Sequence, residues 1–174
     1  HRELTMTEAN NLLGNDNIAQ TNSDKIALAR KAIKGKLAIA TFGEIVSILM
    51  RSPQYRNYTL ADLDWLVAPA LGNRQFSLIQ TPNEKTNLPK SAGVVMWANV
   101  SKEIDDRILA NTGKPIQLTA EDRNSGENFW ITDAVGERQM LSAAIQNLRQ
   151  KVFKSHPVRT FVRAEDGSIK IAQF

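Results

Sequence analysis

Residues 128–153 read NFWITDAVGERQMLSAAIQNLRQKVF and place a β-strand directly before an α-helix. After a turn at residues 124–126, the β-branched and aromatic residues of 128–135 predict the strand. In residues 137–153, apolar side chains recur at the spacing of one helix face. This apolar stripe consists of Leu141, Ile145, Leu148 and Val152. The junction predicts a protein in which a long helix packs against a sheet.

The flanking segments supply the rest of the fold. Four further strands are predicted, at residues 75–80, 93–99, 160–164 and 168–172. Ser101 can cap a helix that extends to Asn111. The order of these elements predicts an α+β fold, a sandwich with a central, largely antiparallel sheet flanked by helices.

The N-terminal region differs from this pattern. Residues 1–5 precede Met6 and are interpreted as an expression scar. Residues 7–23 are rich in Asn and poor in large apolar side chains, which predicts a flexible segment. We therefore separate residues 1–23 from a single domain at residues 24–174.

Two helices are expected at the start of this domain. Residues 24–34 predict a short basic amphipathic helix that ends at Gly35, and residues 42–50 predict a second one. The basic helix is either a solvated surface helix or a docking surface for an acidic partner.

Two short cap signals follow. Ser52 before Pro53 predicts the start of a new turn. Residues 59–62 resemble a capping box, which opens a helix expected to bury three side chains and to end at Pro69 and Gly72. These side chains are Leu60, Leu63 and Val67.

The composition excludes several classes of site. The 174 residues include no cysteine, which removes disulfides, thiolate metal sites and cysteine nucleophiles. His156 is the only histidine outside the expected scar, so the chain has too few histidines for a histidine-based metal site and little basis for a Ser/His/Asp hydrolase. We therefore predict no metal site.

Charge and hydropathy constrain partners and location. The net charge of +4 favours acidic partners. Nucleic acid is not expected, because no recognition helix or glycine-rich RNA-binding segment is visible. The longest apolar-rich stretch, residues 38–50, is too short to span a membrane and contains Glu44. With no secretory signal, the cytoplasm is the expected compartment.

Asp133 is the first candidate for chemistry. Strand alternation places it on one face with Phe129, Ile131 and Val135, where a carboxylate is costly unless it is paired. A structural salt bridge or a tuned catalytic carboxylate would both explain it.

The end of one strand and the start of the long helix each have more than one interpretation. Trp97 and Asn99 end a strand and are either core and turn residues or part of a site. Gly136 and Arg138 begin the long helix, whose N-terminus could bind an anion such as phosphate.

Three motifs follow one another along the chain: Phe42-Gly43 with SPQYRNY at residues 52–58, WANVS at residues 97–101, and AEDRNSG at residues 120–126 leading into WITD at residues 130–133. In order and spacing they resemble the toxin-activating lysine acyltransferases, the family that activates RTX protoxins. The first motif is similar to the family's Gly…Ser-Pro-x-His-Arg-x-Trp block. Residues 97–101, WANVS, match its Ser-Trp-Ala-Asn-Leu-Ser segment. Residues 120–126, AEDRNSG, leading into residues 130–133, WITD, match Ala-Glu-Asp-Trp-x-Ser-Gly followed by Trp-Phe-Ile-Asp. A further likeness lies in Pro69-Ala70 with Gln75-Phe76, and the resemblance covers roughly residues 42–163.

The resemblance implies a GNAT-like acyltransferase fold and transfer of a fatty acyl group from acyl-acyl carrier protein to internal lysines of a protoxin. No bound cofactor is implied beyond the donor's phosphopantetheine thioester, and a homodimer is a family-level expectation. The acidic carrier protein suits the basic charge of the chain. The helix start at Gly136 and Arg138 would face the phosphopantetheine arm.

Carried over residue by residue, the resemblance implies catalytic roles for Tyr55, Asp133 and Ser52. The residues expected to bind the donor are Arg56, Trp97, Asn99, Gly136 and Arg138. Tyr55 stands where the family has its catalytic histidine, so it either takes a different role or marks an inactive branch.

Two other functions stay open on the sequence. One is a non-catalytic binding module for a carrier protein or toxin. The other is a small-molecule N-acyltransferase that uses acyl-CoA, which the absence of a Gly-x-Gly pyrophosphate loop disfavours.

Overall fold

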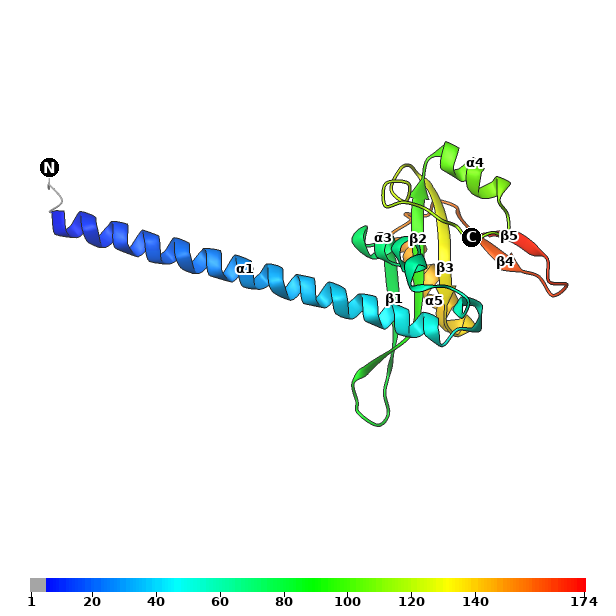
Figure 1. The fold of residues 1–174 in the computed structure, drawn as a ribbon, viewed down its shortest axis with the longest axis horizontal. Helices are drawn as coiled ribbons and strands as arrows, with labels where there is room; N and C mark the ends of the chain where they lie inside the picture. Colours follow the sequence, from blue (N-terminus) through cyan, green and yellow to red (C-terminus); the bar gives the residue numbers. More distant parts are fainter. Residues whose placement is uncertain (1–5) are drawn as a thin grey trace. The chain divides into compact units, whose positions relative to one another are not determined.

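A computed structural model describes residues 6–174, so the expected scar at residues 1–5 lies outside the described residues. The chain divides into two compact units, residues 1–41 and residues 42–174. The second unit contains the whole sheet and is shown with its element labels in Figure 1.

Helix α1 (Met6–Met50) runs through both segments that the sequence separated. Its end at Met50 agrees with the prediction, but residues 7–23 are helical, and the end predicted at Gly35 is wrong. Gly35 does not adopt the left-handed conformation of a helix-ending glycine. A single helical glycine costs only about 1 kcal/mol, so the helix continues through it.

The second unit is built on a five-stranded sheet with the strand order β1-β2-β3-β4-β5. Its strands are β1 (Phe76–Pro82), β2 (Pro89–Val100), β3 (Asn128–Val135), β4 (Val158–Arg163) and β5 (Ile169–Gln173). All neighbours are antiparallel except β3 and β4, which run parallel. The α+β class with a largely antiparallel sheet is therefore confirmed, and the GNAT-like character stays a prediction.

One face of the sheet is covered by the last turns of α1 and by short helices. These are η1 (Pro53–Tyr55), η2 (Leu60–Asp62), α2 (Leu63–Leu66) and α3 (Ala68–Gly72). Ile45, Ile48 and Leu49 of α1 are buried against Val94 and Met96 of β2. The predicted capping box at Thr59 is present, but Leu60 is 87% exposed, and Pro69 lies in the first turn of α3 instead of ending a helix.

The other face is covered by α5 (Arg138–Lys151), which lies behind the sheet in Figure 1. Leu148 and the following Phe153 are buried with Val95, Trp97 and Ile131. The predicted stripe is wrong at one position, since Val152 is 38% exposed and Phe153 fills the core in its place. The sheet thus separates two apolar layers.

Helix α4 (Lys102–Ala110) closes one end of the sheet, with Ser101 accepting a hydrogen bond from Ile104 as its N-cap. Its buried Asp105 accepts hydrogen bonds from Trp130 Nε1, at 2.7 Å, and from Arg159. This carboxylate therefore ties α4 to both β3 and β4.

Candidate active site

A β-bulge in β3 sets the direction of Asp133. Met96 pairs with Asp133, yet the next residue, Trp97, pairs with Ile131, so Thr132 is the extra residue on β3. Asp133 therefore lies with Val135 on the Met96 face, and Ile131 lies on the α5 face. The predicted shared face with Phe129 and Ile131 is wrong, because the bulge reverses the alternation at this point.

Tyr55 approaches Asp133 from the short helix η1. Ser52 occupies the N-cap position and Pro53 the first helical position, as predicted, although the Ser52 side chain makes no capping hydrogen bond. The hydroxyl of Tyr55 donates a 2.7 Å hydrogen bond to Oδ1 of Asp133. The Tyr55 ring also packs 5.5 Å from the ring of Tyr58. A phenol and a carboxylate, far apart in sequence, thus form one dyad.

The dyad lines a cavity of about 300 Å³. The parallel ladder between β3 and β4 consists of only two residue pairs and ends at Trp130 and Arg159. Beyond that point, residues 131–134 and 160–161 form one side of the cavity, and residues 113–116 and Trp65 contribute to the rest of the wall. The site therefore opens where the two parallel strands stop pairing.

Burial tunes both members of the dyad. It raises the pKa of Asp133 from the usual 3.8 to about 6, against the opposing effects of the Tyr55 hydrogen bond and the Arg123 charge. Burial and the neighbouring Asp133 charge raise the pKa of Tyr55 well above its usual value. Near neutral pH, Asp133 is largely ionised and Tyr55 keeps its proton, so the pair comprises a proton acceptor and a hydrogen-bond donor.

Arg123 is a buried charged residue near the site that no sequence pattern predicted. Its side chain is fully buried, and Nη1 donates to the carbonyl oxygen of Trp97 at 3.0 Å. Nε and Nη2 make no hydrogen bond within the described chain. Arg123 stands where the similar family segment has tryptophan. This departure from the family pattern is the one sequence feature that could have marked Arg123 as a candidate site residue.

Asn99 holds the loop that carries Arg123. Its side chain accepts a 2.7 Å hydrogen bond from Gln75 and donates to Asn124 and to the carbonyl of Gly126, both at 2.9 Å. Gln75 also donates to the carbonyl of Arg123 at 2.8 Å. Asn99 thus contacts the loop that positions Arg123 and is not among the residues that line the dyad cavity.

The structure does not bring the remaining predicted residues to the dyad. Ser52 donates to the Ile48 carbonyl at 3.3 Å, and Arg56 is exposed at the C-cap of η1. Trp97 is buried against Phe153 on the opposite face of the sheet. None of the three lines the dyad cavity.

Gly136 and Arg138 lie at the start of α5, outside the dyad cavity. A Cβ placed on Gly136 would lie 3.3 Å from Gly93 Cα, so this glycine permits close approach of two backbones. Their predicted role in donor binding stays a prediction.

His156 lies apart from the dyad as well. Its Nδ1 is 2.8 Å from the Phe153 carbonyl oxygen, and its ring packs against Phe129.

Among the residues of the described chain, no helix is long and apolar enough to cross a lipid bilayer.

Comparison with known proteins supplies the family. The family model HlyC, the RTX toxin acyltransferase family, matches residues 36–174. An uncharacterized protein of Synechocystis, sll0720, is 22% identical over 75% of this chain and 84% of its own length. A leukotoxin-activating lysine-acyltransferase, LktC, of a Pasteurella haemolytica-like species is 28% identical over 76% of this chain and 74% of its own.

A third relative is the RTX-II toxin-activating lysine-acyltransferase ApxIIC of Actinobacillus pleuropneumoniae, 26% identical over 63% of this chain and 62% of its own length. The family match includes the dyad, Tyr55 and Asp133, and also Arg123, whose charge acts on Asp133. The chain therefore belongs to the RTX toxin acyltransferase family.

Proposed function

We propose that this protein is a protein-lysine acyltransferase that moves a fatty acyl group from acyl-acyl carrier protein to internal lysines of an RTX-type protoxin. The family match and the names of the two lysine-acyltransferase relatives support the reaction class. The hydrogen bond between Tyr55 and Asp133 inside a cavity is the observation that carries the proposal.

The two side chains have complementary tasks in this reaction. The target lysine first loses one proton to solvent, and its neutral nitrogen then attacks the thioester carbonyl carbon. As the C–N bond forms, Asp133 accepts the second proton that the nitrogen sheds. As the C–S bond breaks, the Tyr55 hydroxyl protonates the leaving sulfur. Asp133 returns its proton to Tyr55 through their hydrogen bond, which restores the starting state.

The raised pKa of Asp133 favours its role as the proton acceptor. A carboxylate with a pKa of about 6 accepts a proton more readily than an ordinary aspartate and is still ionised at neutral pH. The raised pKa of Tyr55 excludes it as the base, and its proton moves to sulfur as Asp133, protonated by the lysine nitrogen, replaces it through their hydrogen bond. Tyr55 therefore takes a different role from a catalytic histidine in this mechanism.

The donor and the assembly are parts of the same proposal. An acidic carrier protein suits the net charge of +4, and its phosphopantetheine thioester would enter the dyad cavity. We place the reaction in the cytoplasm, on a homodimer, with Gly136 and Arg138 near the phosphopantetheine arm.

Co-expression with an RTX protoxin and acyl carrier protein tests the proposal. Intact-mass analysis of the protoxin should reveal added acyl groups with the wild-type protein and almost none with Asp133→Asn. Peptide mapping should place these groups on lysines. A protoxin of unchanged mass beside folded wild-type protein would instead favour a non-catalytic binding module.

A further inference from the structure

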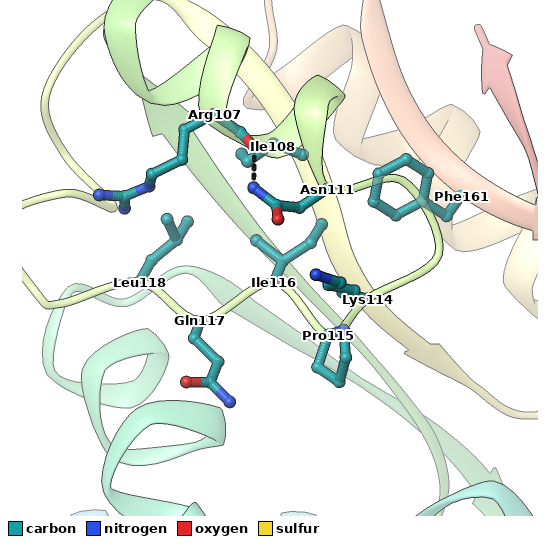
Figure 2. Close-up of a pocket in the computed structure, with 9 residues that line it drawn as sticks. All are labelled: Arg107, Ile108, Asn111, Lys114, Pro115, Ile116, Gln117, Leu118 and Phe161. Atoms are coloured by element: carbon teal, nitrogen blue, oxygen red, sulfur yellow. Dashed lines mark hydrogen bonds between the residues drawn. The ribbon is translucent and has the colours of Figure 1, made fainter.

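A second cavity of about 370 Å³ adjoins the dyad cavity. It is formed by the end of α4, residues 114–118 and Phe161 of β4, and Figure 2 shows these side chains around it. Ile108 and Leu118 form buried apolar parts of its wall. No residue of the candidate dyad belongs to this second cavity.

Two polar side chains of the second cavity, Arg107 and Asn111, have partners within the chain, whereas those of Lys114 and Gln117 are exposed to solvent. Arg107 pairs with Asp122 at 2.9 Å, and Asn111 Nδ2 donates to the Arg107 carbonyl at 2.8 Å, the bond drawn in Figure 2. The apolar surface of the cavity includes that of Ile108, Ile116 and Phe161. These apolar side chains gain free energy when they are covered by hydrocarbon.

The two cavities share a wall. Residues 114–116 and Phe161 line both of them, so the two cavities lie next to each other at this segment. When the donor thioester lies at Tyr55 and Asp133, the hydrocarbon chain attached to its carbonyl carbon must extend away from the dyad. Three residues of the shared lining, Pro115, Ile116 and Phe161, are apolar and would contact a straight hydrocarbon substituent that extends toward the second cavity.

We propose that the second cavity receives the straight hydrocarbon tail of the acyl group whose thioester lies at the dyad. The inference rests on the proposed function and adds the tail-binding site and its key residue, Ile116. Ile116 is partly buried at the junction, so its size sets how far a chain extends past it.

Displacement of cis-parinaric acid, a fluorescent fatty acid, by octanoate, dodecanoate and hexadecanoate tests the inference without donor or toxin. For the wild-type protein, affinity should rise roughly fourfold per buried methylene until the cavity is filled. Ile116→Trp should shift the preference toward octanoate and weaken hexadecanoate at least about tenfold, since the lost burial exceeds two methylenes. Ile116→Ala should shift the preference toward hexadecanoate.

Leu88→Trp is the matched control, because Leu88 is 65% exposed and lines neither cavity. It should bind the three acids as the wild-type protein does. Opposite shifts for the two Ile116 variants support the inference, and the alanine variant provides the test should the tryptophan variant fail to fold. Unchanged preferences in folded Ile116 variants, or equal shifts in the control, would overturn it.

The outcome is separate from that of the proposed function. If the protein transfers no acyl group but the Ile116 variants shift the fatty-acid preference, the tail-binding site is supported and the proposed reaction is contradicted. If lysine acylation occurs but its chain-length preference is unchanged in the Ile116 variants, the proposed reaction is supported and the tail-binding site is contradicted.

Discussion

The Tyr55 hydroxyl and the Asp133 carboxylate lie 2.7 Å apart because one extra residue in β3, Thr132, turns Asp133 toward η1. A regular strand would aim that carboxylate at the α5 side of the sheet, where Ile131 and Phe153 form an apolar layer. The bulge therefore both removes a charge from that layer and assembles the dyad.

Removing the Tyr55 hydroxyl should reduce turnover with little effect on folding. Tyr55→Phe keeps the ring against Tyr58 and deletes only the donor to Asp133. The maximal acylation rate should fall by roughly 10²- to 10⁴-fold, the usual contribution of one proton-transfer group. Steady-state rates over a range of donor concentrations measure this, and donor affinity should change little.

Two companion variants make the result specific. Tyr55→His should retain activity, because imidazole can serve as acid or base near neutral pH. Tyr58→Phe removes a hydroxyl from the same cavity and leaves the Tyr55–Asp133 bond intact, so its loss should be much smaller. A wild-type rate for Tyr55→Phe would make Tyr55 a packing residue.

Asp133→Asn should be more stable than the wild-type protein at neutral pH. Folding raises the pKa of this carboxyl from 3.8 to about 6, so its charged form is disfavoured in the native state. Its favourable contribution exists below pH 3.8 and is lost as the pH rises to about 6, a loss of at most about 3 kcal/mol. Asparagine resembles the protonated form and avoids this loss.

Thermal unfolding from pH 3.5 to pH 8 checks the sign. The variant should melt several degrees above the wild-type protein at pH 7, and the two curves should converge near pH 3.5. A variant that is less stable at pH 7 would mean that the ionised carboxylate stabilises the fold.

Arg123 should hold the pKa of Asp133 down. Its buried charge favours the ionised carboxylate, so Arg123→Met should raise the pKa of Asp133 above about 6. A carbon-13 titration of the Asp133 carboxyl measures this directly. Arg163→Met, a change of the same kind at an exposed residue, should leave that pKa as it is. Equal titration curves for all three proteins would make Arg123 purely structural.

The sequence predicted the layers of the fold better than the site. Alternation and helical periodicity located β3 and α5 almost to the residue, because each buries one apolar face. The bulge at Thr132 and the parallel pairing of β3 with β4 are tertiary features that leave no local signal. Asp133 was therefore recognised as unusual for the right chemical reason and assigned to the wrong face.

The burial of Arg123 was not predicted for a related reason. A charged residue in the stretch AEDRNSG normally indicates a solvated loop, yet Gln75 and Asn99 fix that loop and direct the guanidinium inward. Those contacts join segments far apart in the chain. Similarly, the continuation of α1 through Gly35 contradicts a local rule that holds only where glycine takes a left-handed conformation.

A methyl group on Gly93 should destabilise the sheet. A Cβ there would lie 2.5 Å from the Val135 carbonyl oxygen and 3.2 Å from Gly136 Cα, both backbone atoms that cannot move independently of β3. Gly93→Ala should lower the unfolding free energy by about 1–3 kcal/mol, the range for overpacking. Gly43→Ala, in an open helical position of α1, should raise it by up to about 1 kcal/mol. Urea unfolding of both variants measures the contrast, and a neutral Gly93→Ala would contradict the close packing of β2 and β3.

The basic charge that suits an acidic carrier protein is concentrated in one part of α1. Residues 24–41 hold five basic residues and one acidic residue, whereas residues 42–174 hold sixteen basic and fourteen acidic ones. The same stretch exposes large apolar side chains between its lysines. These are Ile26, Leu28, Ile33, Leu37 and Ile39. A basic helix with exposed apolar groups suits a negatively charged protein surface.

Carrier binding should therefore depend on salt through this helix. Exposed charges are screened beyond about 8 Å at physiological ionic strength, so affinity for acyl carrier protein should fall as salt is added. Replacing both Lys31 and Lys34 by Glu should weaken binding at low salt and flatten that dependence. The matched change at Lys151 and Lys154, exposed near the end of α5, should have a smaller effect. Calorimetric titrations at several salt concentrations measure both pairs, and equal effects would place the carrier surface outside α1.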